Sequence, residues 1–150
     1  MGRYLEEFSE GEIFTTPART LTESDIMSFV GLTGDFNPVH TDEVFAAATP
    51  FGGRIAHGPM MVGMAFGLLS RLDLIDGTVL ALKGIDWTFE APLRAGDTVH
   101  VRAEVIEARP SSRHQDRGVV RLCLEIIDQN DQVCQIGNAV VIMMRKPSDS

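Results

Sequence analysis

The sequence predicts one α+β domain in which helices come first and a mostly antiparallel sheet follows. In the first half, up to about residue 72, apolar residues recur at helical spacing. From residue 78 onward they alternate with polar residues, which is typical of half-buried strands. A length of 150 residues with 44% hydrophobic content suits a single core. We therefore expect one domain over residues 1–150, with residues 146–150 as a frayed tail.

The first predicted elements are a short extended segment at residues 11–21 and a helix at residues 22–33. Thr22 is a typical helix cap, and Asp25, three residues later, completes a shortened capping box. Gly34 is expected to end this helix, because glycine readily adopts the left-handed conformation found at many helix C-termini.

Two further helices are predicted before the sheet. The first is short and covers residues 41–48, with Thr41 as its cap and Asp42 at the positive end of the helix dipole. The second covers residues 59–72, begins with Pro59 and is apolar on every side. A helix with this pattern must be surrounded by the rest of the protein.

The sheet is predicted from segments in which apolar and polar residues alternate: 85–89, 99–105, 119–128 and 133–144. A long polar connection precedes the third of these, and a polar turn joins the last two into a hairpin. One helix cannot cover both faces of a sheet of four or five strands. The uncovered face or edge leads us to expect a homodimer.

The charge distribution argues against nucleic acid as a partner. The formal net charge is −8, and the basic residues are scattered along the chain. Phosphate neutralisation supplies most of the affinity for DNA or RNA, so an acidic chain of this kind is not expected to bind either. A small anionic ligand needs only a local patch, for which the candidates are Arg54, Lys83, Arg94 and the loop at 111–117.

No segment of the sequence is typical of membrane insertion or secretion. The longest apolar stretch, residues 59–69, falls short of the roughly 20 residues that span a bilayer. The first twelve residues are too acidic for a signal peptide. Cys123 and Cys134 lie in apolar alternating segments without metal-binding spacing, so we expect reduced, buried thiols and a cytoplasmic protein with no membrane partner.

The stretch GDFNPVHTDE, residues 34–43, holds the first candidate site. Pro38 fixes its own backbone angle and restricts the preceding residue, so this loop is stiff enough to hold Asp35 and His40 in a fixed relation. A carboxylate and an imidazole together can bind one water and move its protons. The alternative is a turn without catalytic role, because Asp35 and Asn37 are common turn residues.

A metal site is a further alternative for this part of the chain. Its ligands would be Asp35, His40, Asp42 and His57. Their spacing matches no familiar zinc signature, so we favour the other two interpretations.

The second candidate site is the stretch IAHGPMM, which leads into the apolar helix. The backbone amide of Gly58, directly before Pro59, would point out of the positive end of the helix and could bind an oxyanion. Glycine also lets a substrate carbonyl approach the main chain closely. The alternatives are that Gly58 only turns the chain and that His57 is a packed structural residue.

Together these motifs resemble a known family. FVGLTGDFNPVHTDEVFAAA followed by FGGRIAHGPMM resembles the hydratase motif of the MaoC-like dehydratases and (R)-specific enoyl-CoA hydratases, which are built on the hot-dog fold. An aromatic residue, a G-D-x-N-P-x-H block, a trailing alanine and a downstream A-H-G occur in the expected order over residues 29–60. The resemblance implies a long helix wrapped by an antiparallel sheet. It also implies a homodimer, which can assemble further into a trimer of dimers, with acyl-CoA at the subunit interface.

Carried over residue by residue, the resemblance implies that Asp35 and His40 form the catalytic pair on the water. Gly58 would donate its amide to the thioester oxygen, and Asn37 would orient the loop. The implied reaction is the reversible syn addition of water to a trans-2-enoyl-CoA, which gives an (R)-3-hydroxyacyl-CoA. It needs no metal and no redox cofactor.

The expected substrate contacts are Asn37, Pro38, Arg54, Ile55, His57, Met64 and Phe66. In one respect the chain departs from the family, because Met64 and Phe66 lie in a region where related hydratases carry a small hydroxyl residue. Bulk there favours a short or unusual acyl chain, such as a branched or carboxylated one. Two alternatives stay open, namely a hot-dog thioesterase and a non-catalytic acyl-CoA-binding protein.

Overall fold

The computed structural model describes residues 1–147, so the predicted tail lies partly outside the described residues. The elements in chain order are the 3-10 helix η1 (Leu5–Glu7), strands β1 (Ile13–Thr15) and β2 (Arg19–Thr20), helices α1 (Glu23–Thr33), α2 (Pro38–Thr41), α3 (Glu43–Ala47) and α4 (Gly58–Ser70), and strands β3 (Val79–Phe89), β4 (Thr98–Pro110), β5 (Arg117–Ile127) and β6 (Val133–Met144). Helices therefore precede the main strands, which confirms the predicted α+β order.

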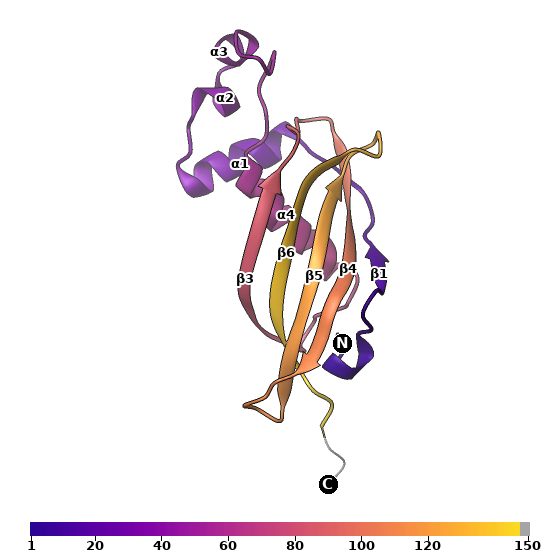
Figure 1. Ribbon diagram of the computed structural model, residues 1–150. Helices are drawn as coiled ribbons and strands as arrows, with labels where there is room; N and C mark the ends of the chain where they lie inside the picture. Colours follow the sequence, from indigo (N-terminus) through magenta and orange to yellow (C-terminus); the bar gives the residue numbers. More distant parts are fainter. Residues whose placement is uncertain (148–150) are drawn as a thin grey trace.

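The strands form one antiparallel sheet in the order β1-β4-β5-β6-β3, and β2 pairs with β4 as well. Helix α4 runs across one face of this sheet, and α1 lies beside the first turns of α4 (Figure 1). Helices α2 and α3 lie beyond the end of the sheet at which α4 begins (Figure 1). This arrangement puts the loops on either side of α2 and α3 next to the first turn of α4.

Helix α1 has the boundaries that its sequence predicts. The Thr22 side chain accepts a hydrogen bond from the Asp25 backbone, and the Asp25 carboxylate accepts one from the Thr22 backbone. At the other end Gly34 takes the left-handed conformation, with φ of 74°. The chain therefore turns sharply at Gly34 and enters the candidate site.

The loop that follows differs from the prediction, because part of it is helical. Asn37 caps the four-residue helix α2 through its side chain, and Pro38 supplies the first helical residue. Helix α3 then begins at Glu43 with Asp42 as its cap, in place of the predicted Thr41. Thr41 remains in α2, where its hydroxyl donates to backbone carbonyls.

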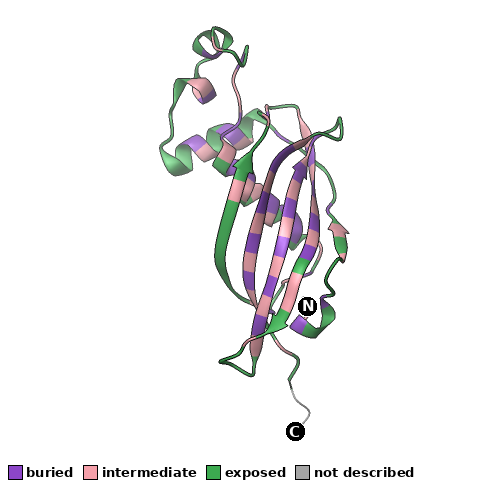
Figure 2. Cartoon of the chain, viewed as in Figure 1, coloured by how far each residue is buried: buried purple, intermediate pink, exposed green. Residues whose placement is uncertain are grey.

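The core lies between α4 and the inward face of the sheet. From α4 it includes Met61, Ala65, Leu68 and Leu69, and from the sheet residues such as Leu124. Along the central strands buried and half-buried residues alternate, as Figure 2 shows. The predicted period-2 pattern is therefore the pattern of burial in β4, β5 and β6. The predicted half-buried segment 85–89 differs, because Ile85 and Phe89 are exposed there.

The edge strand β3 is far more exposed than the strands beside it (Figure 2). It pairs with β6 on one side, and within residues 1–147 no strand pairs with its other side. Large apolar residues are open to solvent along it, including Leu82, Ile85 and Phe89. A long apolar strand with an unpaired edge is normally covered by another element or chain.

Two expectations about single residues are corrected. Cys134 is buried and free, and burial raises its thiol pKa to about 11, whereas Cys123 is free but only half-buried. In the predicted tail, Lys146 is held to η1: its backbone amide donates to Glu6 Oε2 at 3.0 Å, and its Nζ lies 3.1 Å from Glu7 Oε1. No helix among residues 1–147 is long and apolar enough to cross a membrane.

Gly137 on β6 provides a test of the sheet packing. It lies opposite Trp87, and a Cβ atom there would meet Trp87 Cε3 at 2.1 Å and Asp86 O at 2.4 Å. Because strand backbone and a packed indole cannot move freely, we expect Gly137→Ala to lower the free energy of unfolding by about 1–3 kcal/mol. Urea denaturation measures this change.

The control is Gly31→Ala on the exposed side of α1, because a Cβ atom at Gly31 would meet no atom within 4 Å. We expect this variant to unfold at the same urea concentration as the wild type or a higher one. Equal losses in the two variants would contradict the packing described for Gly137.

Candidate active site

The Asp35 loop is held by hydrogen bonds from its backbone amides to nearby side-chain oxygens. The Asp35 amide donates to Thr33 Oγ1 at 3.2 Å, and Asp35 Oδ1 accepts from the Asn37 amide at 3.2 Å. One carboxylate oxygen of Asp35 therefore stabilises the turn, which is the alternative role that the sequence left open. The Asp35 side chain is still 50% exposed, and its second oxygen, Oδ2, lies 3.9 Å from His57 Nε2.

His40 is buried on α2 with its ring in a defined orientation. Its Nδ1 lies 2.8 Å from the carbonyl oxygen of Ile55. Because a carbonyl only accepts hydrogen bonds, Nδ1 must carry the hydrogen. The neutral ring then keeps the lone pair on Nε2, which is the atom left for proton transfer.

His57 lies behind this pair and is 1% exposed. Its Nε2 donates to the backbone carbonyl oxygen of Asp35 at 3.1 Å. Its ring stacks on that of His40, with centroids 3.8 Å apart and planes at 28°, and also contacts Phe29 of α1 at 4.9 Å. Because His57 is covered in this way, it offers no surface to a ligand. The structure therefore places His57 behind the site and not at the predicted substrate contact.

Polar atoms of Asp35, His40 and His57 lie within 4.8 Å of one another. A cation shared by the two histidines would have to lie in the plane of each ring, at about 2.0–2.1 Å from the nitrogen if it were zinc. Two nearly parallel rings stacked at 3.8 Å do not direct their lone pairs to one point. Asp42, the remaining candidate ligand, caps α3. This arrangement suits proton transfer better than metal binding.

Gly58 begins α4, and its N–H is one of the first-turn amides that have no acceptor within a helix. The preceding residue, His57, makes no side-chain cap bond to this turn. A hollow of about 390 Å³ lies beside Gly58, and its wall includes Ile55, Phe89 and Gln135. Gly58 therefore places a first-turn amide, at the positive end of the α4 dipole, among the residues that line this hollow.

Gln135 is a site residue that the sequence did not indicate. It is 3% exposed, and its Nε2 donates to the Gly58 carbonyl oxygen at 3.4 Å. Trp87 Nε1 donates to Gln135 Oε1 at 2.9 Å and so fixes the amide. The sequence signal for Gln135 was a polar residue in an alternating apolar segment. Its partner, Gly58, is 77 residues away in the chain, so local sequence could not identify the contact.

Arg54 is engaged in ion pairs at this end of the molecule. Its Nε lies 2.7 Å from Glu43 Oε2, and its Nη1 bonds Glu23, so Arg54 ties α1 to α3. The Arg54 hydrogen bond lowers the pKa of the Glu43 carboxyl. Arg94 donates to the backbone carbonyl oxygen of Phe51. The charge of Arg54 is therefore already paired with two carboxylates, whereas Arg94 bonds backbone carbonyl oxygens.

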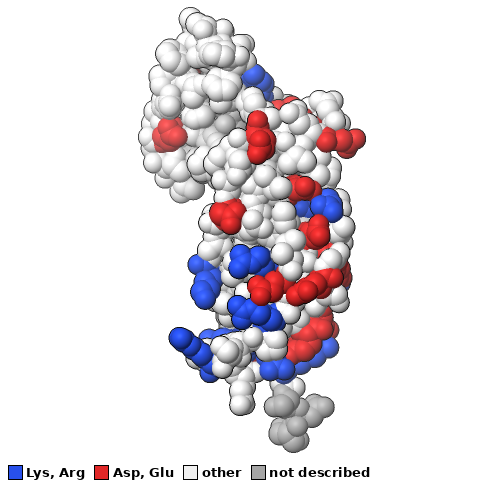
Figure 3. All heavy atoms as spheres, viewed as in Figure 1, with Lys and Arg blue, Asp and Glu red and all other residues white. Residues whose placement is uncertain are grey.

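The other candidate cations for an anionic patch lie elsewhere. Lys83 and the 111–117 loop share a hollow of about 530 Å³ with Arg109. Figure 3 shows that basic side chains gather toward the end of the sheet remote from α2 and α3. The structure thus separates this basic hollow from Arg54 and Arg94.

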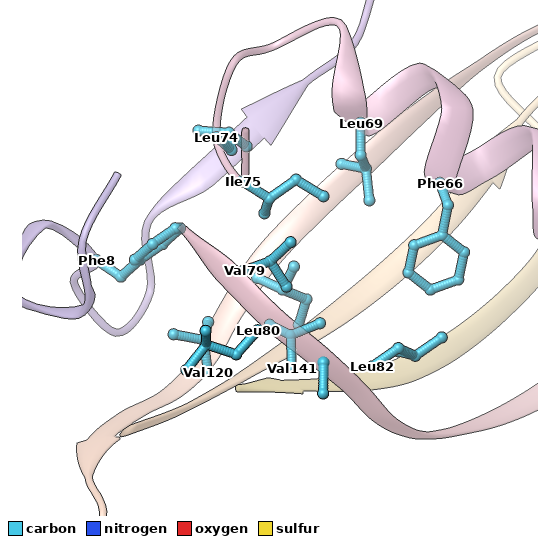
Figure 4. Close-up of a pocket in the computed structure, with 12 residues that line it drawn as sticks. Phe8, Phe66, Leu69, Leu74, Ile75, Val79, Leu80, Leu82, Val120 and Val141 are labelled. Carbon is cyan, nitrogen blue, oxygen red and sulfur yellow. The ribbon is translucent and has the colours of Figure 1, made fainter. Parts of the chain in front are cut away.

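The two bulky α4 residues point to different sides of the helix. Phe66 lines an apolar cavity of about 210 Å³ together with Leu69 and β3 residues such as Leu82 (Figure 4). Met64 lines a separate hollow on the α1 side, next to Phe29. Of the two, Phe66 therefore adjoins the apolar cavity between α4 and the sheet.

Known proteins share both the sequence and the fold. The family described as MaoC like domain matches residues 7–123. The chain is 36% identical over 139 residues to the 3-hydroxybutyryl-CoA dehydratase of Methylorubrum extorquens, covering 93% of this chain and 78% of that protein. It is 36% identical over 110 residues to an (R)-specific enoyl-CoA hydratase of Rhodospirillum rubrum, covering 73% and 74%.

Solved structures agree with these relatives. The MaoC-like dehydratase from Rhodospirillum rubrum superposes with a TM-score of 0.88 at 30% identity, over 97% of this chain and 99% of that one. A Mycobacterium tuberculosis protein with a double hot-dog fold matches with a TM-score of 0.79 at 22% identity, over 99% and 46%, which shows the fold alone. The chain has the hot-dog fold and belongs to the MaoC-like dehydratase family.

Proposed function

We propose that this chain is an (R)-specific enoyl-CoA hydratase, or 3-hydroxyacyl-CoA dehydratase in the reverse direction. The observation that supports this most is the convergence of Asp35 and His40, whose polar atoms belong to one cluster within 4.8 Å. The fixed orientation of His40 and the nearby amide of Gly58 complete the arrangement. The names of the hydratase and dehydratase relatives agree with it.

In the proposed hydration, one water is added across the C2–C3 double bond of the enoyl thioester. The water oxygen bonds to C3 while one water proton passes to the pair formed by Asp35 and His40. The pair returns a proton to C2 on the same face of the substrate and so regains its starting state. The negative charge that develops on the thioester oxygen is stabilised by the Gly58 N–H. No metal or redox cofactor takes part.

A thioesterase on the same fold is less well supported. Enzymes of that kind usually place their carboxylate on the long helix, and Gly58–Ser70 contains no acidic residue. The non-catalytic alternative would not require a buried histidine with a fixed tautomer next to a carboxylate. Both observations favour hydration.

The proposed enzyme is a homodimer in which β3 lies at the interface. Leu82 and Ile85 are exposed on its unpaired edge. Beyond the sheet, Phe36 is 65% exposed and Val44 is 84% exposed, on the segment that holds the site. A second copy would cover both surfaces, and the acyl-CoA would bind where they meet. Further assembly into a trimer of dimers is compatible with this contact.

The acyl chain is proposed to be short. Phe66 is eight residues after Gly58, which is about 12 Å along the helix axis. We infer that the acyl chain runs from the Gly58 amide along α4 toward the apolar cavity, where the Phe66 ring would limit the length of a straight chain. A carboxylated acyl group has less support, because Arg54 is already paired with Glu23 and Glu43.

The first test replaces each member of the proposed catalytic pair and measures the loss of hydratase activity. With crotonyl-CoA, the wild type should consume the absorbance of the conjugated thioester and give the (R)-3-hydroxy product on chiral analysis. Asp35→Asn and His40→Gln should each lower kcat by about 10²–10⁴-fold, because each removes a proton-transfer group.

Asp42→Asn is the matched control for charge, because asparagine can still cap α3. It should retain wild-type kcat. The proposal fails if the wild type hydrates no enoyl-CoA in a panel of graded length, branching and charge, or if Asp35→Asn is as active as Asp42→Asn.

The dimer is tested by light scattering. We expect twice the mass of one chain for the wild type and the mass of one chain for Ile85→Lys, because a lysine on β3 opposes edge pairing. Gln115→Lys adds the same charge to the exposed loop between β4 and β5 and should remain dimeric. A single-chain mass for the wild type would contradict the proposed interface.

The role of Phe66 is tested with acyl chains of graded length. Crotonyl-CoA should be preferred over decenoyl-CoA, and Phe66→Ala should raise kcat/KM for decenoyl-CoA by roughly tenfold, as expected if two more methylene groups become buried at about 0.8 kcal/mol each. Met64→Ala is the control on the opposite side of α4 and should not change the preference. An equal effect of both substitutions would refute the assignment.

A further inference from the structure

His57 is a buried titratable residue that takes no proton in the proposed reaction, yet it contacts both members of the catalytic pair. It touches Asp35 through a hydrogen bond and His40 through ring stacking. It also contacts Phe29 of α1 and directly precedes Gly58. One side chain therefore links α1, the Asp35 loop and α2 to the first turn of α4.

The hydrogen bond determines the tautomer of His57. Its acceptor is the backbone carbonyl oxygen of Asp35, at 3.1 Å, so Nε2 must carry the hydrogen. In the neutral ring Nδ1 is then an acceptor, and it is buried without a hydrogen-bond partner among residues 1–147. The two stacked rings thus have opposite tautomers, with the hydrogen on Nδ1 in His40 and on Nε2 in His57.

Packing alone does not account for a histidine at this position. An apolar ring would fill the same space without burying an unpartnered nitrogen, which is unfavourable. What an apolar ring cannot do is donate to the Asp35 carbonyl. A flexible amide could donate to that carbonyl but could not support the His40 ring. Histidine is a side chain that makes both contacts.

We propose that His57 is a positioning residue for the hydratase reaction, and this inference rests on the function proposed above. The Nε2–H bond holds the Asp35 backbone, and so sets where the Asp35 carboxylate meets the water. The stacked ring prevents His40 from tilting about its bond to Ile55, so His40 Nε2 stays directed at the same water. His57 itself does not touch the substrate.

Two substitutions separate these contacts. His57→Phe keeps a ring against His40 and removes the donor to Asp35, whereas His57→Gln can keep a donor and removes the ring. Because small displacements of reacting groups are costly, each should lower kcat for crotonyl-CoA by about 10- to 100-fold while KM changes much less. Leu124→Ala, in the buried core on β5, controls for lost stability. It should lower the melting temperature but leave kcat unchanged in the folded protein.

A second measurement does not depend on turnover. The chain has four histidines, so long-range proton–nitrogen spectra of the labelled whole chain can resolve each ring. The wild type should show His40 and His57 as single, opposite tautomers. In His57→Gln the His40 signals should broaden or average between tautomers, and in His57→Phe the Asp35 amide signal should shift. Leu124→Ala should show neither change.

The outcomes distinguish this inference from the proposed function. If the wild type hydrates crotonyl-CoA but both His57 variants retain its kcat, the positioning role is refuted and the function stands. If the wild type hydrates no enoyl-CoA, the function is refuted, and the ring signals still decide whether His57 positions the pair. Unchanged His40 signals in His57→Gln would refute the positioning role in either case.

Discussion

The site depends on two hydrogen bonds that run in opposite directions between the Asp35 loop and the segment before α4. His40 donates to the carbonyl oxygen of Ile55, and His57 donates to the carbonyl oxygen of Asp35. Each acceptor is a backbone carbonyl, so each ring has only one possible tautomer in its neutral form. The two short segments thereby fix each other, although neither has enough regular structure to be rigid alone.

The sheet and α4 supply the rigid support that these two short segments lack. Burial of α4 against the inward face of the strands fixes its first turn, and therefore the amide of Gly58. Gln135 of β6 bonds the Gly58 carbonyl oxygen and is itself held by Trp87 of β3. Hydrophobic packing thus determines where the proposed oxyanion contact lies, and local hydrogen bonds determine where the proposed proton-transfer groups lie relative to it.

The sequence predicts those features that depend on neighbouring residues. The capping box of α1, the stop at Gly34 and the alternation in the strands all rest on contacts within a few positions. Helix α2 was missed because four residues are too few to show a helical period. The position of His57 against His40, and of Gln135 against Gly58, depends on tertiary packing that no local pattern encodes. The separation of Met64 from Phe66 was predictable, because residues two apart lie on opposite sides of a helix.

Phe89 connects the edge of the sheet to the site. It is the last residue of β3, and its ring covers the Cα of Gly58 so closely that a Cβ atom there would lie 2.8 Å from Phe89 Cε1. In the proposed dimer the same strand presents its unpaired edge to a second copy. In a dimer, a sliding of one β3 strand along the other would shift both Phe89 rings, and hence both oxyanion sites, together. In the proposed dimer, the geometry around the Gly58 amide would therefore depend on how the two β3 strands lie against each other.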